Sequence, residues 1–197
     1  MISNNNRIPI SDIKLKTSNV YSKYGDYNFK VLHEDFTFTL VGIENVPKGL
    51  FVEKDFNPCS LPKKIQKAVF LANAVLLSGK SVFSNNTLIV HDNIPNWLSE
   101  MKQLRQVTFQ GILRCSVKPL GSTSMDGLII DRIDVENRQK VLEEIISFKK
   151  LDYFVYRRLE VDEVDFIKKN APNLKVWSFE EYEERIKKGQ FRFDWYN

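Results

Sequence analysis

The last third of the chain alternates strand-like runs with helix starts, and this alternation restricts the fold more than any other sequence feature. The run from Tyr153 to Leu159 precedes a helix start at which Asp162 is the predicted cap. The run Leu174 to Trp177 precedes a second helix, for which Ser178 and Glu181 form a capping box. A helix over 136–149 comes before both. We therefore expect an α/β C-terminal part, residues 136–197, built around a β-α-β-α-β unit whose last strand begins near residue 191.

Residues 1–135 show a different period. Apolar side chains alternate with polar ones in 27–31 and again in 36–40, and the polar segment 33–35 between these runs is typical of a hairpin turn. This alternation predicts an antiparallel meander at the N-terminus. The fold class expected is thus α+β, with a mostly β part over 1–135 and an α/β part over 136–197, or one continuous domain.

Two further elements are predicted for the first part. Apolar residues at helical spacing between Ser60 and Gly79 predict one long buried helix, with Gly79 as its C-terminal stop. The runs 107–113 and 127–133, joined by a loop over 118–126, predict a central hairpin. We find no repeat of fixed period, and two strand-helix pairs are too few to predict a solenoid.

The two cysteines bear on compartment and chemistry. Cys59 and Cys115 stand far apart without a CxxC spacing, so neither a disulfide framework nor a zinc site is indicated, and both are expected to be buried thiols. The N-terminus lacks the apolar core of a signal peptide, and no apolar run is long enough to span a bilayer. A cytoplasmic protein without membrane contact is predicted.

Candidate catalytic residues are sparse. The sequence contains His33 and His91, and His91-Asp92 follows a strand without a nucleophile motif beside it. Asp131 and Asp134 differ by an odd number of positions, so on one strand they point to opposite faces and cannot share an ion. No catalytic residue, metal ligand or cofactor is therefore predicted, and we lean against an enzyme. A hydrolase or nuclease with an unrecognised site is the least favoured alternative.

Arginine and aromatic residues gather near the C-terminus, and these are the usual anchors of protein interfaces. The candidate partner-binding residues are Arg157, Arg158, Phe191, Trp195 and Tyr196. They favour a non-catalytic protein-binding domain of an accessory, inhibitor or toxin-neutralising immunity type, with another protein as the partner.

Charge supports a second hypothesis. Residues 1–125 contain 15 Lys and Arg against 9 Asp and Glu, whereas the remainder is slightly acidic. A basic region with strand-like runs resembles in outline an OB-type barrel that binds nucleic acid through aromatic and basic groups. The residues that would carry this alternative are Arg105, Phe109, Arg114 and Lys118.

Overall fold

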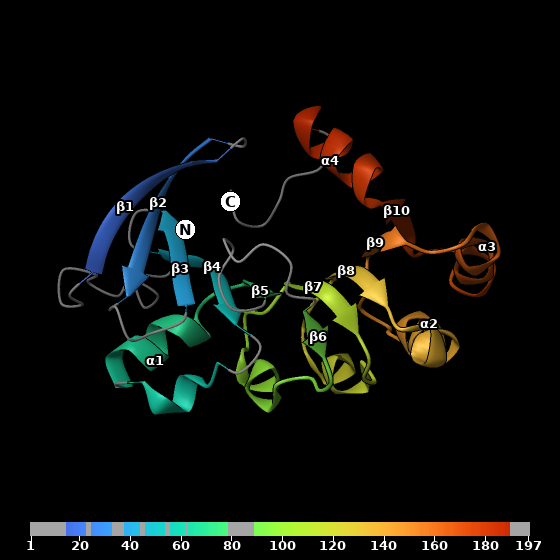
Figure 1. Ribbon diagram of the computed structural model, residues 1–197, viewed down its shortest axis with the longest axis horizontal. Helices are drawn as coiled ribbons and strands as arrows, with labels where there is room; N and C mark the ends of the chain where they lie inside the picture. The colour runs from blue at the N-terminus through green and yellow to red at the C-terminus, as the bar shows by residue number, and fades with distance from the viewer. Residues whose placement is uncertain are drawn as a thin grey trace.

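The computed structural model describes residues 15–22, 25–32, 38–43, 46–53, 56–61, 63–78 and 89–189. These residues form one mixed sheet with helices on both faces (Figure 1). Within the described ranges, no helix is long and apolar enough to cross a membrane.

The sheet has ten strands, in the order β1-β2-β3-β4-β5-β7-β8-β9-β10, with the short β6 paired to β7. Strands β1 to β4 pair antiparallel, whereas every pairing from β4 to β10 is parallel. The strands are β1 (Leu15–Ser22), β2 (Gly25–Leu32), β3 (Phe38–Ile43), β4 (Val46–Glu53), β5 (Ala74–Ser78), β6 (Val90–His91), β7 (Gln106–Leu113), β8 (Gly127–Ile133), β9 (Tyr153–Arg158) and β10 (Lys175–Ser178).

Short helices connect the parallel strands. In chain order they are the 3-10 helix η3 (Pro58–Ser60), α1 (Lys63–Phe70), the 3-10 helices η4 (Asn96–Glu100), η5 (Lys118–Ser122) and η6 (Val135–Asn137), then α2 (Arg138–Ile146), α3 (Val161–Asn170) and α4 (Phe179–Lys187). Helices α1 and α2 lie on one face of the sheet and α4 on the opposite face (Figure 1).

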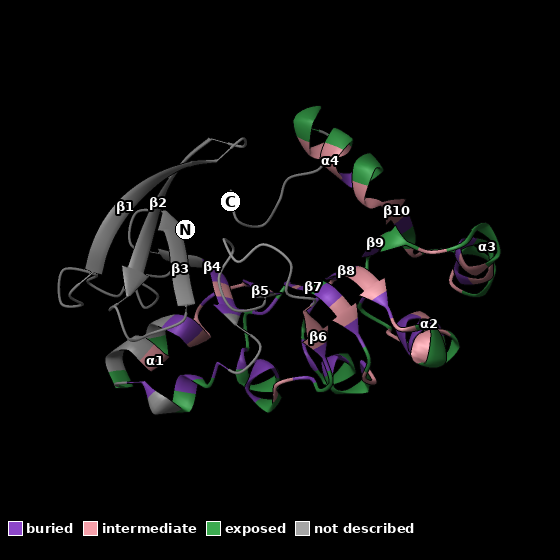
Figure 2. Cartoon of the chain, in the orientation of Figure 1, coloured by how far each residue is buried: buried purple, intermediate pink, exposed green. Residues whose placement is uncertain are grey.

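A row of apolar side chains at matching register runs through all six parallel-paired strands of the main stack. Each member is at most 8% exposed, and the row lies in the main core together with residues of α2 and α3 (Figure 2). Burying each such side chain stabilises the fold by roughly 1.5–3 kcal/mol. The row consists of Leu50, Val75, Val107, Leu128, Phe154 and Val176.

This stacking of strand-and-connection units in chain order is the topology of a solenoid, in which each unit contacts its neighbours. We expected no repeat of fixed period, and the spacings in the row agree with this, although the stacked topology itself was not expected. The row positions recur at variable spacings of roughly 21 to 32 residues, so a search for one fixed period does not detect them. On four of the strands a second buried apolar residue stands two positions after the row residue, namely Val52, Leu77, Phe109 and Ile130.

The predicted central hairpin is also wrong, because β7 and β8 pair parallel. A parallel pair needs a crossover of about a dozen residues or more. Residues 114–126, which include η5, supply that crossover. The segment predicted as a flexible loop is therefore a structured connection.

The long helix predicted between Ser60 and Gly79 divides into two elements. Helix α1 ends at Phe70, and Ala74–Ser78 forms β5, with β4 and β7 parallel on its two sides. Strands buried on both faces are apolar without alternation, so their sequences resemble those of buried helices. Gly79 lies outside the described residues.

The C-terminal prediction agrees better with the structure. Strands β9 and β10 pair parallel and flank α3, and the capping box of α4 forms as expected, with Glu181 N donating to Ser178 Oγ at 3.2 Å. Helix α3 begins earlier than predicted, because Glu160 rather than Asp162 is its N-cap. The predicted terminal strand and the 33–35 turn lie outside the described residues.

The second face of the sheet has its own small apolar cluster beneath α4, built on Ile129, Tyr153, Val155 and Tyr182. Tyr153 on β9 crosses over Gly127 on β8 and donates a hydrogen bond from Oη to Gln106 Oε1 on β7, at 2.6 Å. A Cβ at position 127 would overlap the Tyr153 ring. Gly127 therefore allows one side chain to tie three strands together.

We predict that Gly127→Ala destabilises the protein by about 1–3 kcal/mol, because the added methyl group displaces the Tyr153 ring and breaks its buried hydrogen bond. Tyr153→Phe, which removes the hydrogen bond alone, should cost about 1 kcal/mol. Urea unfolding measures both, with the exposed Ser124→Ala as the control. A Gly127→Ala protein as stable as the control would contradict this account.

Candidate functional site

His91 is only 2% exposed and lies at the end of β6. Its Nε2 donates a hydrogen bond to the carbonyl of Gln110 at 2.8 Å, and its ring packs edge-on against Phe109. His91 is therefore a buried residue that joins β6 to β7. An imidazole buried in this way has no access to a substrate.

Each of three aspartates in or beside β8 forms an ion pair with an arginine in or next to a neighbouring strand. Arg105 Nε donates to Asp126 at 2.8 Å, and Arg157 Nε lies 3.0 Å from Asp131. Arg114 Nε donates to Asp134 at 2.9 Å. The Asp134 pKa is lowered first by the backbone N–H of Glu136 and then by Arg114. Among the described residues, no group of three or more His, Cys, Asp or Glu side chains could hold a metal ion.

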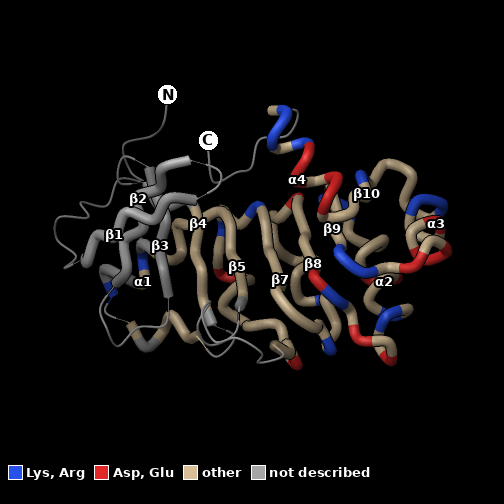
Figure 3. The backbone as a smooth tube through the Cα atoms, turned by 45° about the horizontal axis from the view of Figure 1, so that its top comes forward, with Lys and Arg blue, Asp and Glu red and all other residues tan. Residues whose placement is uncertain are grey.

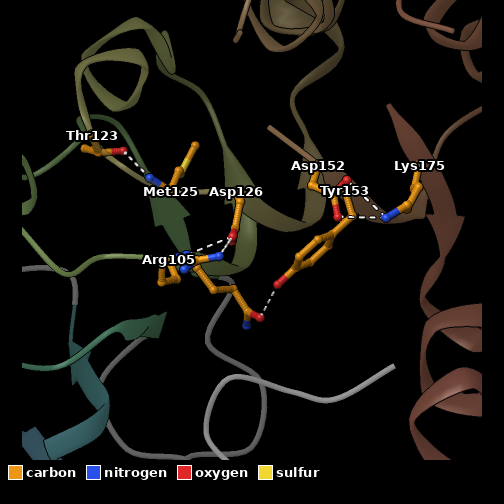
Figure 4. Close-up of polar contacts among 8 residues, drawn as sticks. Arg105, Thr123, Met125, Asp126, Asp152, Tyr153 and Lys175 are labelled. Carbon is orange, nitrogen blue, oxygen red and sulfur yellow. Dashed lines mark hydrogen bonds and ion pairs between the residues drawn. The ribbon is translucent and has the colours of Figure 1, made fainter. Parts of the chain in front are cut away.

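Two ion pairs lie at the N-terminal ends of the parallel strands β7 to β10. Figure 4 shows Arg105 with Asp126 and, two strands away, Lys175 with Asp152, at 2.8 Å in the second pair. These pairs are largely exposed, and exposed pairs contribute little to stability. Within each of these two pairs the opposite charges neutralise one another.

Two like charges lie side by side near the C-terminal ends of β8 and β9. Arg132 on β8 and Arg158 on β9 are register partners, and Figure 3 shows basic residues at these strand ends. Neither arginine makes an ion pair with any residue in the described part of the chain. Side chains alternate along a strand, so both lie on the face opposite to the Asp131–Arg157 pair. Arg132 is half-buried and Arg158 is exposed.

Aromatic rings and arginines combine on the α4 face. The rings of Tyr153, Trp177 and Tyr182 stack with centroids 5.9–6.3 Å apart. The Arg157 guanidinium lies 4.2 Å from the centre of the Phe179 ring, and Arg185 lies over Trp177 at 4.9 Å. Trp177 and Phe179 remain partly exposed.

The sequence-predicted partner residues divide into two groups. Arg157 and Arg158 end β9 and are both exposed, on opposite faces of the sheet. Phe191, Trp195 and Tyr196 lie outside the described residues. Sequence reasoning missed Arg132, although its position near the end of an apolar strand is a signal shared with Arg158.

The four residues of the nucleic-acid alternative do not converge. Arg105 precedes β7 and Arg114 follows it, so they lie at opposite ends of an eight-residue strand, and each is paired with an aspartate. Phe109 is fully buried and cannot offer its ring to a base. Lys118 begins η5 on the crossover to β8.

The cysteines differ from one another. Cys59 is exposed, contrary to the expected burial, and Cys115 is half-buried just beyond β7. Burial, together with the nearby Asp92 and Glu144 carboxylates, raises the pKa of the Cys115 thiol from an ordinary value of 9.0 to about 11, although a backbone hydrogen bond acts in the opposite direction. Cys115 is therefore a protonated, weakly nucleophilic thiol at neutral pH.

Comparison with known proteins gives no guide to this arrangement: no family model, no curated protein and no solved structure matches the chain.

We predict that one thiol per chain, that of Cys59, reacts rapidly with an aromatic disulfide reagent at pH 8, while Cys115 reacts only after unfolding. Because the folded state holds the Cys115 proton more tightly, this thiol stabilises the fold below pH 9, and that contribution is lost as the pH rises from about 9 to about 11. Urea midpoints at pH 8 and 10.5 measure this effect. The Cys115→Ala variant should lose less stability over this interval than the wild type.

Proposed function

We propose that the chain is a non-catalytic protein-binding domain that contacts an acidic segment of its partner with Arg132 and Arg158, at the ends of β8 and β9. The observation that carries the proposal is the cross-strand pairing of these two arginines without an acidic neighbour in ion-pair contact among the described residues. An accessory, inhibitor or toxin-neutralising role is a narrower form of this proposal and stays a prediction.

Like charges at directly opposed positions of a sheet destabilise it. Three other arginines in or next to these strands have their charges neutralised by an ion pair with an aspartate, namely Arg105, Arg114 and Arg157. Two adjacent guanidinium groups without such contacts lower the stability of the fold, and a bound partner that neutralises them would offset this loss. A carboxylate-bearing partner would neutralise both, because guanidinium groups bind carboxylates through paired hydrogen bonds.

The surroundings of the pair fit a protein partner. Val135 and Val161 follow β8 and β9 and are 77% and 79% exposed, the described large apolar residues that face solvent most openly. Arginines bordered by exposed apolar side chains are typical of interface surfaces.

The architecture also supports binding rather than catalysis. Stacked strand-and-connection units create extended surfaces, and solenoid proteins use such surfaces to bind other proteins. The described histidine is buried, and the described aspartates of β8 are engaged with arginines. These side chains therefore favour no hydrolytic chemistry.

We predict that a fluorescein-labelled deca-glutamate peptide binds the wild-type protein at low ionic strength, and that Arg132→Gln/Arg158→Gln weakens binding at least about tenfold, because two charge-assisted contacts are lost. Fluorescence anisotropy measures both affinities. The matched control is Lys168→Gln/Lys169→Gln, which removes two exposed positive charges from α3.

Equal losses in the two double variants would overturn the proposal, since they would show a response to net charge alone. A labelled oligonucleotide of similar charge that binds tighter than the peptide would also overturn it, in favour of the nucleic-acid alternative. Selective loss of peptide binding in the arginine variant supports it.

We further predict that Arg158→Gln does not destabilise the unliganded protein and stabilises it by about 0.2–1 kcal/mol, because it relieves repulsion from Arg132. The gain should shrink in 0.5 M salt, which screens exposed charges. Urea unfolding at low and high salt measures this difference. A structural role for Arg158 predicts the reverse, a loss of stability at both salt concentrations.

A further inference from the structure

A pocket of about 360 Å³ lies near the N-terminal ends of β8 and β9, between η5 and residues 147–151, which join α2 to β9. Leu120, Met125, Phe148 and Leu151 form its apolar walls, and three of these four are buried. This volume falls within the range of small-ligand sites.

Three lysines surround the pocket. Lys118, Lys149 and Lys150 are among its lining residues, are exposed, and make no ion pair with described residues. None of the described residues that line the pocket is acidic. Three positive charges above apolar walls attract a negatively charged group and accommodate a hydrophobic body.

The wall that carries Lys118 is held in place from within the protein. The buried Glu144 carboxylate accepts hydrogen bonds from Val117 N at 2.7 Å and from Ser116 Oγ at 2.8 Å, immediately before η5. Within η5 itself, Gly121 lies close to the Phe148 ring, which a Cβ at this position would approach to 3.1 Å. The pocket is thus formed by packed and hydrogen-bonded segments.

We propose that this pocket binds a small organic anion, with its acidic group on Lys118, Lys149 and Lys150 and its hydrophobic body against Leu120, Met125 and Phe148. The site is independent of the proposed protein contact. Met125 and Leu151 precede the starts of β8 and β9, whereas Arg132 and Arg158 stand near the ends of the same strands. Each proposal can therefore fail without the other.

The test uses two dyes that share the same aromatic body. The first, 8-anilinonaphthalene-1-sulfonate, carries an acidic group, and the second, N-phenyl-1-naphthylamine, is neutral. Fluorescence titration of the full chain should show saturable binding of the sulfonate. The Lys118→Gln/Lys149→Gln/Lys150→Gln variant should bind it about tenfold more weakly, with little change for the neutral dye.

The matched control is Lys140→Gln/Lys168→Gln/Lys169→Gln, which removes the same charge from exposed positions on α2 and α3 and should change sulfonate affinity by less than about twofold. Equal affinities in the two triple variants would overturn the proposal, as would the absence of saturable binding to the wild type. Amide chemical shifts of the wild type provide a second measurement that needs no variant. Shifts confined to Gly121, Met125 and Leu151 support the proposal, and shifts confined to other residues contradict it.

Discussion

The buried row from Leu50 to Val176 holds the parallel strands in register. Six parallel-paired strands each contribute one side chain to it at matching register, so each of these strands is held in register by the row residues of its neighbours. A shift of one residue in any strand would turn its apolar side chains to the opposite face. The stack therefore determines which residues stand at each strand end, and both candidate sites lie at those ends.

Fixing the register also determines which charges become neighbours. Asp131 and Arg157 form an ion pair because β8 and β9 place them side by side, and the next position along the same two strands brings Arg132 against Arg158. One register thus creates both a neutralised pair and a repulsive one. Shifting the strands to separate the two arginines would break the buried row, so the repulsion is retained.

Elements formed by interactions between residues close in the sequence could be predicted, whereas those that depend on distant residues could not. The capping box of Ser178 and Glu181 and the strands β9 and β10 were predictable because these signals act within a few residues. Strand β5 was mistaken for helix because a strand covered on both sides shows no alternation. The direction of the β7–β8 pair depends on how residues 114–126 fold, which a turn-based prediction takes for a loop.

Of the candidate sites, Arg157 and Arg158 were recognised from composition. The lysine pocket was not, because it joins segments that only the crossover connections bring close together.

The α+β class and the alternation of strand and helix after residue 136 could be predicted from the sequence, because composition and local periodicity carry this information. The stacking of the parallel strands in chain order, the burial of His91, the pairing of Arg132 with Arg158 and the gathering of Lys118, Lys149 and Lys150 around one pocket became visible only in the folded chain. These outcomes depend on contacts between residues far apart in the chain, whose register is set by the shared burial of one apolar row.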